Sequence, residues 1–581
     1  MKKSTFLFCL AGLFSLTAHA QDWQQLGETI QANDAYLQLG YSITLSADGT
    51  TFAVGAPDTQ GSGGTIEDHS YVNVYTWQSG VWAQVGDTIW GGEPFLSPPN
   101  SNYFVPGGGN DILLSEDGTT IVIAERGYYY INPQNENEII FSDRVRIFDL
   151  TDGEWVQAGE DIFEPGVRNI NLSHDGNILA IGDDYNDTNG DNSGSVKVFE
   201  KQDGEWVQLG STLYGTGDLN YFGSSVALSA DGGVLVIGCS RGAAGGITPN
   251  PGYTNVYNLE NGEWVLDETF AGLYTDYWGS GAGCGSSVAV SHDGTVVAMG
   301  SYQYVNEGTT TPVGNVRVFQ KTEGTWQQVG GSLEGSRSSY ENTKHMIDLS
   351  ADGSILAIGT RSSSMLGNVK VYQLTEGEWV QAGETISSAA TGESNFGTAL
   401  SLSSDGSIVA VGISGANVGD FLSAGAAKVY QNCSLTQITT EAEDGQTACN
   451  GSTGILTATA GPELYANASL NWYDSADATE PVFTGATFTT PELTADTTYW
   501  VEAETATGCS SARVEVTVTV NAVPDAPATE AEQEFEEGAT LNSLVIETTG
   551  TVVWYSDEAL TTEIPAGTLL ADGTTYYAVQ L

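Results

Sequence analysis

The stretch LSADGSILAIGTR, from Leu349 to Arg361, decides the fold, because the chain contains seven versions of it. The other six read LSADGTTFAVGAP from Leu45, LSEDGTTIVIAER from Leu114, LSHDGNILAIGDD from Leu172, LSADGGVLVIGCS from Leu228, VSHDGTVVAMGSY from Val290 and LSSDGSIVAVGIS from Leu402. An Asp-Gly pair between two apolar runs predicts a β-hairpin, because both residues tolerate the backbone angles of a tight turn. Each copy therefore predicts two antiparallel strands of a repeated unit.

Two further strands follow each hairpin. After the quoted copy come VKVYQL (Val369–Leu374), a Gly-containing turn and a strand that begins at Trp379. The last of the seven third strands ends near Tyr430 and has no such successor. Instead, DWQQLGETI, from Asp22 near the N-terminus, matches EWVQAGETI, from Glu378. An N-terminal strand that completes the last unit would close the units into a ring.

The expected fold class is therefore all-β, with a seven-bladed β-propeller over residues 21–431 that is closed by an N-terminal strand at 23–30. Closure leaves only short, protected strand edges. A linear solenoid of the same units is the alternative, but it would have no use for a displaced strand and would need capping repeats. The Trp residues that begin the fourth strands are interpreted as packing between blades, because they recur so strictly.

Several first strands open with Phe-Gly, as in YFGSSVALS from Tyr221 and NFGTALSLS from Asn395, and the first unit contains VGAP at Val54–Pro57. These motifs resemble the FG-GAP repeat, which is found in the propeller of integrin α subunits and in secreted bacterial proteins. The resemblance implies calcium in the hairpin loops, held by an Asp-x-Asp-x-Asp-Gly run. Each loop here has a single aspartate before its glycine, so Asp352 is interpreted as a turn former.

After the ring, residues 432–521 carry short alternating strands that predict an immunoglobulin-like β-sandwich. A second copy spans 522–581, because VVWYSDEA from Val552 matches LNWYDSAD from Leu470. This copy ends before a counterpart of the first copy's last strand, and we expect it to be truncated. Both resemble the Ig-like modules of large bacterial surface proteins, a resemblance that implies an outer-membrane secretion machinery as a partner.

Residues 1–20 read as a signal peptide that is cleaved after Ala20, with Lys2 and Lys3 before an apolar run. We therefore expect a secreted or cell-surface protein, and no later stretch is apolar enough to span a membrane. The chain has 73 acidic and 17 basic residues, for a formal net charge of −56. Such a surface repels nucleic acid, which requires Lys and Arg to neutralise phosphates.

The secreted chain would contain five cysteines, and secretion permits disulfides. Cys449 precedes the first strong strand of the first Ig-like domain and Cys509 precedes its last, so these two are the predicted pair. Cys239 and Cys284 either pair with each other or pack as two thiols. Cys433 is left over or competes for Cys449.

The best metal candidate in the sequence is DDYNDTNGDNSG, from Asp183. Asp187, Asn189 and Asp191 offer oxygen ligands at alternating positions, as calcium loops do. The loop lacks the glycine at position six and the glutamate at position twelve, so a solvated acidic loop is the alternative. Calcium is the only cofactor that the sequence suggests.

The sequence contains no recognisable catalytic motif, neither a nucleophile elbow nor a zinc-protease helix nor a phosphate loop. His174 and His292 occupy the same turn position as Ala or Ser in other units. They are interpreted as exposed turn residues, because nothing in the sequence pairs them with a nucleophile.

The long connections after the second and the fourth strands of the units differ from one another, and function tends to reside on variable loops held by a rigid scaffold. The aromatic residues in them are the predicted ligand-binding set: Tyr128, Tyr129, Tyr130, Tyr274, Tyr277, Trp278, Tyr302 and Tyr304. Exposed Tyr and Trp provide contact area at low entropy cost. The alternative is that they fold back over their own loops.

The sequence thus favours a secreted or cell-surface binding protein that adheres to a protein or polysaccharide through the loop-rich face of the propeller, with the Ig-like modules as a stalk. One alternative is an extracellular polysaccharide-degrading enzyme with carboxylates at the mouth of the propeller channel. Another is a structural component of a surface layer.

Overall fold

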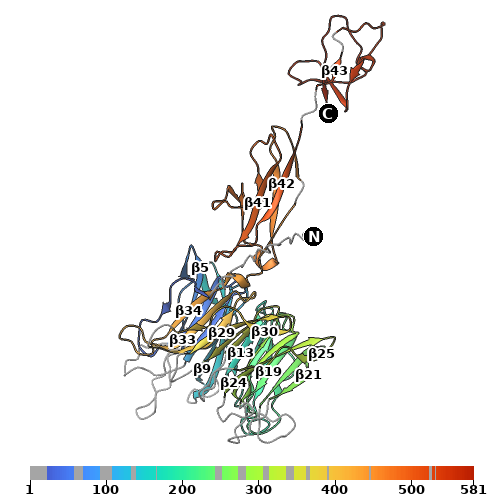
Figure 1. Cartoon of the computed structure of the whole chain (residues 1–581). Helices are drawn as coiled ribbons and strands as arrows, with labels where there is room; N and C mark the ends of the chain where they lie inside the picture. The colour runs from blue at the N-terminus through green and yellow to red at the C-terminus, as the bar shows by residue number, and fades with distance from the viewer. Residues whose placement is uncertain are drawn as a thin grey trace, which may run out of the picture. The chain divides into compact units, whose positions relative to one another are not determined.

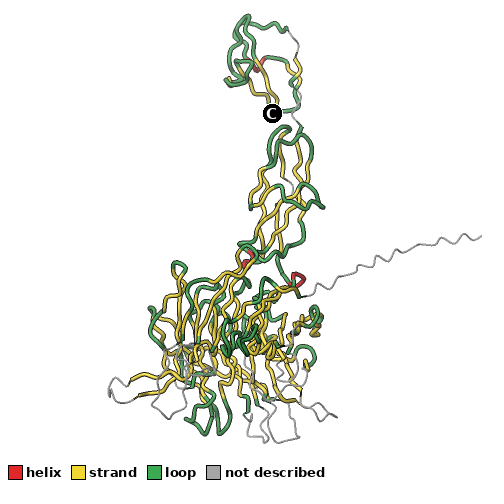
Figure 2. Tube along the Cα trace, turned by 90° about the vertical axis from the view of Figure 1, so that its left-hand side faces the viewer, coloured by secondary structure: helices red, strands yellow, loops and turns green. Residues whose placement is uncertain are grey.

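The structure is a computed structural model, and it is all-β apart from a few short turns of 3-10 helix (Figure 2). The chain divides into two units, residues 1–437 with 505–509 and residues 438–504 with 510–581. The structure describes residues 23–57, 70–91, 107–131, 139–164, 166–241, 252–272, 283–304, 313–334, 346–360, 367–388, 392–443, 446–522, 526–529 and 532–581. The predicted signal peptide lies outside the described residues.

The first unit contains seven antiparallel sheets of four or five strands (Figure 1). The first strands are β3 (Ser42–Leu45), β8 (Gly107–Leu114), β13 (Asn169–Leu172), β18 (Phe222–Leu228), β22 (Cys284–Val290), β27 (Ile347–Leu349) and β32 (Glu393–Leu402). The second strands are β4 (Thr51–Ala56), β9 (Thr120–Ile131), β14 (Ile178–Asp183), β19 (Val234–Cys239), β23 (Val296–Tyr304), β28 (Ile355–Thr360) and β33 (Ile408–Ala416).

The outer strands complete each sheet. The third strands are β5 (Tyr71–Gln78), β10 (Ile139–Thr151), β15 (Ser195–Gln202), β20 (Tyr253–Glu260), β24 (Val313–Thr322), β29 (Asn368–Thr375) and β34 (Ala426–Gln431). The fourth strands are β6 (Val81–Gln84), β11 (Glu154–Gln157), β16 (Glu205–Gln208), β21 (Glu263–Ala271), β25 (Thr325–Gln328), β30 (Glu378–Gln381) and β1 (Gln24–Gln25). Short additions to six sheets are β7 (Ile89–Trp90), β12 (Ile162–Glu164), β17 (Leu213–Tyr214), β26 (Leu333–Glu334), β31 (Ile386–Ser387) and β2 (Ile30–Gln31).

The N-terminal segment is the outer strand of the sheet that is otherwise made of residues 393–431. In β1, Gln24 pairs with Gln431 and Gln25 with Tyr430, and β2 continues along the same β34. This is the pairing that the match between the N-terminal segment and the Trp379 strand predicts. The first and last parts of the unit are therefore hydrogen-bonded into one sheet.

The seven first strands contact one another in order, and β32 contacts β3, so the sheets form a closed circuit. Backbone hydrogen bonds also join the hairpin turns of neighbouring sheets. They run from the N–H of Ala47 to the C=O of Glu116 (2.8 Å), His174 to Ala230 (3.0 Å), Ala230 to His292 (3.0 Å), His292 to Ala351 (2.9 Å), Ala351 to Ser404 (2.8 Å) and Ser404 to Ala47 (2.8 Å). We call these seven turns the turn belt. Its members all approach one axis.

Each turn of the belt has the sequence Ser-x-Asp-Gly and is stabilised locally. In the first, Asp48 accepts hydrogen bonds from the Ser46 hydroxyl (2.7 Å) and the Thr50 backbone N–H (2.9 Å). Gly49 takes the positive φ of 68° that the end of the turn requires, while Asp48 does not. The aspartate thus uses its carboxylate to cap the turn, as expected for a turn former.

Tryptophans join neighbouring sheets through their indole N–H groups, as their strict recurrence predicts. Each of five donates to a backbone carbonyl just after the fourth strand of the preceding sheet. The pairs are Trp82 and Leu26 (2.9 Å), Trp155 and Val85 (3.0 Å), Trp264 and Leu209 (3.2 Å), Trp379 and Val329 (3.1 Å), and Trp23 and Ala382 (2.9 Å).

Glycines permit the second strand of one sheet to approach the first strand of the next. A Cβ placed on the glycine of the second strand would lie within 2.5 Å of the carbonyl oxygen of a glycine in the neighbouring sheet. The pairs are Gly182 and Gly223, Gly238 and Gly285, Gly359 and Gly397, and Gly412 and Gly40. Two of the partners, Gly223 and Gly397, are the glycines of the Phe-Gly motifs. That motif therefore marks close packing of backbones.

The Ig-like part of the second unit is a sandwich of a three-stranded and a five-stranded sheet. Their strand orders are β35 (Thr439–Ala442), β37 (Ile455–Gly461), β40 (Thr487–Thr489), and β36 (Gln446–Cys449), β42 (Val514–Asn521), β41 (Thr497–Glu504), β38 (Ser469–Tyr473), β39 (Phe483–Thr484). The core is built around Trp472, which is fully buried and packs with Leu456, Val501 and Val516.

The remainder of the second unit has two small sheets. They comprise β43 (Ala528–Thr529) with β44 (Ile546–Glu547), and β46 (Glu563–Ile564), β45 (Val552–Tyr555) and β47 (Tyr577–Gln580). Trp554 is buried in β45, as Trp472 is in β38. This matches the sequence alignment of the two copies. The 3-10 helices are η2 (Cys433–Leu435), η3 (Glu463–Tyr465) and η4 (Leu541–Ser543).

The predicted disulfide between Cys449 and Cys509 is wrong, because Cys509 pairs with Cys433 at a Cα–Cα distance of 5.3 Å. Strand β36 runs parallel to β42 and places Cys449 opposite Asn521, at the end of that strand. Cys509 precedes the first residue of β42, whereas Cys449 lies beside its last residue. The length of β42 alone, roughly 23 Å, therefore separates the two cysteines. Cys449 is an exposed thiol.

Cys239 and Cys284 do not form a disulfide with each other, and the alternative that they pack as two thiols holds. Both are buried as thiols. The Cys239 thiol donates to the Asn220 carbonyl (2.9 Å), and an Arg317 nitrogen lies 3.7 Å from the Cys284 sulfur. Burial raises the pKa of the Cys284 thiol. A buried thiol that is held protonated is a packing residue rather than a nucleophile.

Candidate metal centre

The first strands of the seven sheets surround a cavity of about 200 Å³. Their inner edges would leave backbone N–H groups unpaired, and polar side chains of neighbouring sheets accept from several of them. Thr44 accepts from Leu114 (3.3 Å), Asn171 from Leu228 (2.8 Å), Ser401 from Leu45 (3.1 Å) and Asp348 from Leu402 (2.8 Å). Asp348 is thus engaged in joining two sheets.

At one end the cavity is lined by six of the seven x residues of the Ser-x-Asp-Gly turns, all except Ala351. Because the seven turns are equivalent and the belt joins them, their x side chains approach the same axis. Four of these residues are small: Ala47, Ala230, Ala351 and Ser404. The other three, Glu116, His174 and His292, carry donor atoms. The small neighbours leave space for these longer side chains.

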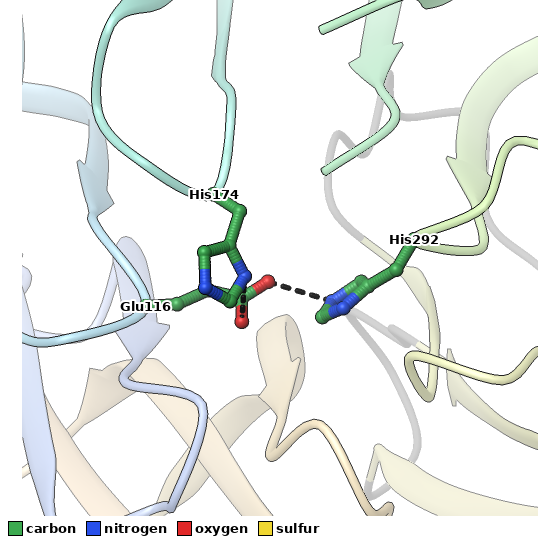
Figure 3. Close-up of side chains that lie close together, drawn as sticks. All are labelled: Glu116, His174 and His292. Carbon is green, nitrogen blue, oxygen red and sulfur yellow. Dashed lines mark ion pairs between the residues drawn. The ribbon is translucent and has the colours of Figure 1, made fainter. Parts of the chain in front are cut away.

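Glu116, His174 and His292 converge from three separate turns (Figure 3). The Glu116 carboxylate lies within ion-pair distance of each imidazole, with Oε2 next to His174 Nδ1 and Oε1 next to His292 Nε2 (2.6 Å). The two rings lie edge to face at a centroid distance of 5.5 Å. Among the described residues, this is the one group of His, Cys, Asp and Glu whose ligand atoms all lie within 4.8 Å of one another.

The Glu116 carboxylate reaches across the ring to three other turns. Besides the two histidines it accepts a hydrogen bond from the Ser404 hydroxyl (3.4 Å), whose turn lies on the opposite side of Glu116 from His174. Its side chain is 19% exposed, whereas those of His174 and His292 are 48% and 35% exposed. The carboxylate is therefore the covered centre of the cluster, and the imidazoles are open to solvent.

The aspartates next to these three residues do not join the cluster. Asp117, Asp175 and Asp293 each accept from the serine two residues before them and from a backbone N–H in their own turn. Burial raises their pKa, but these hydrogen bonds outweigh it and hold the pKa below the usual range. The donor set is thus two imidazole nitrogens and one carboxylate.

This donor set permits two kinds of chemistry. Protonated imidazoles would form ion pairs with the carboxylate. Neutral imidazoles and the same carboxylate would ligate a divalent transition metal, for which two histidines and a glutamate are a known protein ligand set. A single carboxylate flanked by histidines does not provide the pair of carboxylates that most glycoside hydrolases use.

The calcium candidate of the sequence, Asp187, Asn189 and Asp191, forms a folded loop with internal hydrogen bonds. Asp187 accepts from the Asn192 backbone N–H (2.8 Å), the Asn189 amide donates to the Gly215 carbonyl (3.2 Å), and Asp191 accepts from the Asn192 amide (3.2 Å). Each of the three side chains thus has a hydrogen-bond partner, and that of Asn189 lies outside the loop. Calcium binding here stays a prediction.

The predicted aromatic set is only partly within the described chain. Tyr274, Tyr277 and Trp278 lie outside the described residues. Tyr128, Tyr129 and Tyr130 belong to β9, and Tyr302 and Tyr304 to β23, where the structure describes the backbone alone. Residues 128–130 pair with 140–142 of β10, so part of this predicted loop is a long hairpin. Ligand binding by these residues stays a prediction.

His174 and His292 are turn residues as expected, but they are not isolated. The signal that could have joined them to Glu116 is their shared place in the repeat. All three are the x of Ser-x-Asp-Gly, and equivalent positions in a closed ring face the same axis. A single turn shows none of this, because the cluster forms only when the three turns are brought together.

Comparison with known protein families finds a match for one part of the chain. Residues 437–522 match the model of the CHU_C-associated Ig-like domain. This match supports the predicted Ig-like module in this part of the chain. No curated protein sequence matches the chain.

Several solved structures match the chain at low similarity. A putative 6-phosphogluconolactonase from Bacteroides uniformis is 12% identical, with a TM-score of 0.38 over 60% of this chain and 85% of that one. The periplasmic gluconolactonase of Pseudomonas aeruginosa is 16% identical, with a TM-score of 0.37 over 59% and 84%. TolB from Acinetobacter baumannii is 12% identical, with a TM-score of 0.29 over 55% and 60%. At these scores none of them supports an inference about activity.

In the described part of the chain, no helix has the length and apolar character needed to cross a membrane.

Proposed function

We propose that the protein is a secreted or cell-surface binding protein, in which a seven-bladed β-propeller of the FG-GAP type recognises an extracellular protein or glycan. The Ig-like modules would serve as its stalk. The match of residues 437–522 to the CHU_C-associated Ig-like domain is the observation that carries this proposal. The resemblance of both Ig-like copies to modules of bacterial surface proteins, together with the predicted signal peptide, supports it.

The seven sheets suit a binding scaffold. The turn belt, the indole hydrogen bonds and the paired glycines hold neighbouring sheets together. The connections that follow the second and fourth strands would therefore stand on a rigid base. Rigid scaffolds with variable loops are a common basis of recognition. The predicted ligand face is the one that carries these connections, with residues 128–130 on the β9–β10 hairpin as the first candidates.

An extracellular enzyme that degrades polysaccharide is the second candidate. Glu116, a carboxylate at the cavity mouth, is the observation that favours it. Asp348 also lines the cavity, but its carboxylate accepts hydrogen bonds from the backbone N–H groups of Leu349 and Leu402. It is therefore unsuited to serve as the second catalytic carboxylate beside Glu116. A structural surface-layer role is the third candidate, and it requires no specific ligand.

Glycan and extracellular-protein arrays probed with the chain from residue 21 would test the proposal, with released reducing sugar measured in parallel. Saturable binding without sugar release is the expected result. The variant Tyr128→Ala/Tyr129→Ala/Tyr130→Ala should lose that binding, while Glu116→Gln should retain it. Sugar release that Glu116→Gln abolishes would overturn the proposal in favour of the enzyme, and binding to neither array would favour the structural role.

A further inference from the structure

We propose that Glu116, His174 and His292 form a binding site for a divalent transition-metal ion of the Zn²⁺ class. The proposal rests on the geometry of the turn belt and is independent of the proposed adhesive function. It differs in donor type from the calcium sites that the sequence suggested, and it lies away from the loop of Asp187, Asn189 and Asp191. The site would lie on the axis of the ring, where three of the seven equivalent turns contribute one ligand each.

The distances fit an ion with small side-chain movements. The three ligand atoms lie within 4.8 Å of one another, and the two on Glu116 and His292 are 2.6 Å apart. Around a tetrahedral zinc with bonds of about 2.0–2.2 Å, ligand atoms are roughly 3.3 Å apart. The required shifts are on the order of 1 Å, and the partly exposed imidazoles can make them by rotating about χ angles.

The backbone would not need to move. The belt hydrogen bonds of His174 and His292 fix their turns to those of Ala230 and Ala351, at 2.9–3.0 Å. Each turn is also fixed internally by its serine and aspartate. Ligands on a rigid frame bind a metal more strongly than ligands that must first be ordered, because less conformational entropy is lost.

The nitrogen donors select the class of ion. Ca²⁺ and Mg²⁺ prefer oxygen ligands, whereas imidazole suits zinc, copper, nickel and iron. The overall charge of −56 favours cations near the surface in general, but it does not distinguish one cation from another. The two histidines are therefore the residues on which selectivity depends.

The site would keep at least one open coordination position. The other four x residues are three alanines and Ser404, and Ser404 contacts the carboxylate of Glu116. Three protein ligands with a fourth position open are typical of zinc sites that bind water or an external ligand, whereas purely structural sites use four protein ligands. The open position would accept water or a donor atom of a molecule at the mouth of the cavity.

An ion pair and a metal site use the same atoms, so the test must separate them. Zinc binding to the tag-free chain from residue 21 would be measured by calorimetry. Cobalt(II) would be added as a spectroscopic probe, since coordination by imidazole changes its visible absorption. The variants are His174→Ala/His292→Ala and, as a conservative change, Glu116→Gln. The matched control is His69→Ala/His345→Ala, which removes the same number of histidines elsewhere. Circular dichroism would establish that each variant is folded.

One equivalent of zinc should bind to the unaltered chain and to the control. The double histidine variant should bind at least about 100-fold more weakly and Glu116→Gln about 10- to 100-fold more weakly. The cobalt bands should disappear in the double variant, and excess calcium should not displace zinc. Equal zinc affinity in the unaltered chain and the double histidine variant would overturn the proposal, as would the absence of stoichiometric binding to the unaltered chain.

Discussion

The indole Nε1 of Trp23 donates a hydrogen bond of 2.9 Å to the carbonyl of Ala382, although the two residues lie near opposite ends of the first unit. Four other junctions between sheets contain the same contact, with the tryptophan always in the later sheet. At the junction of Trp206, by contrast, the buried indole nitrogen has no hydrogen-bond partner among the described residues. The repeat therefore offers a matched pair of tryptophans for mutation.

Trp23→Phe should lower the free energy of unfolding by about 1 kcal/mol, because a hydrogen bond between sheets is lost. Trp206→Phe should leave it unchanged or raise it slightly, since it removes a buried donor that lacks a partner. Urea unfolding followed by circular dichroism would measure both variants. If both variants lose the same free energy of unfolding, the hydrogen bond contributes nothing and only the size of the aromatic side chain matters.

Gly412→Ala should destabilise the closing junction, by about 2–3 kcal/mol or more. The new Cβ would lie 2.0 Å from the backbone oxygen of Gly40, and backbone cannot move aside as a side chain can. Gly331→Ala is the control, because nothing lies within 4 Å of its Cβ position. The control should change stability by less than about 0.5 kcal/mol. Thermal unfolding with similar midpoints for the two variants would contradict the prediction.

Peptide mapping under non-reducing conditions should recover a peptide that joins Cys433 to Cys509, with Cys449 reactive towards a thiol reagent. The variant Cys433→Ser/Cys509→Ser should have a free energy of unfolding that is about 4 kcal/mol lower, because the disulfide closes a loop of 76 residues in the unfolded chain. The substitution Cys449→Ser should leave the free energy of unfolding almost unchanged, because this thiol is exposed. Recovery of a peptide joining Cys449 to Cys509 would refute the observed pairing.

The titration of Asp183 should lower the free energy of unfolding as the pH rises from about 4 to about 6. Burial, and to a lesser degree the neighbouring carboxylate of Asp184, raises the pKa of Asp183 to about 6. In that interval the folded chain therefore holds a proton that the unfolded chain releases, and raising the pH favours the unfolded state.

Asp183→Asn removes this ionisation. The stability of the variant relative to the unaltered chain should rise from pH 4 to pH 6 and then level off. Unfolding midpoints at a series of pH values would measure the difference. Asp203→Asn is a matched control at a turn of the same sheet. A difference between Asp183→Asn and the unaltered chain that does not depend on pH would mean that the carboxyl of Asp183 titrates normally.

Much of the fold could be predicted because short sequence patterns, which recur along the chain, determine its hairpins. The Ser-x-Asp-Gly turn stabilises itself through contacts within five residues, as Ser46, Asp48 and Thr50 show, so each hairpin is visible in its own sequence. The number of Trp-led strands predicted where the N-terminal segment pairs. The disulfide could not be predicted in this way, because the parallel register of β36 on β42 decides which cysteines are near each other.

The sequence by itself determined the repeated hairpins, the tryptophan junctions, the N-terminal strand of the last sheet and the Ig-like core around Trp472. These depend on backbone angles and apolar spacing that neighbouring residues set. Only the tertiary structure decided that Glu116, His174 and His292 meet. Their turns are far apart along the chain and become neighbours only when seven sheets close around one axis, and it is this closure that directs equivalent side chains to a common point.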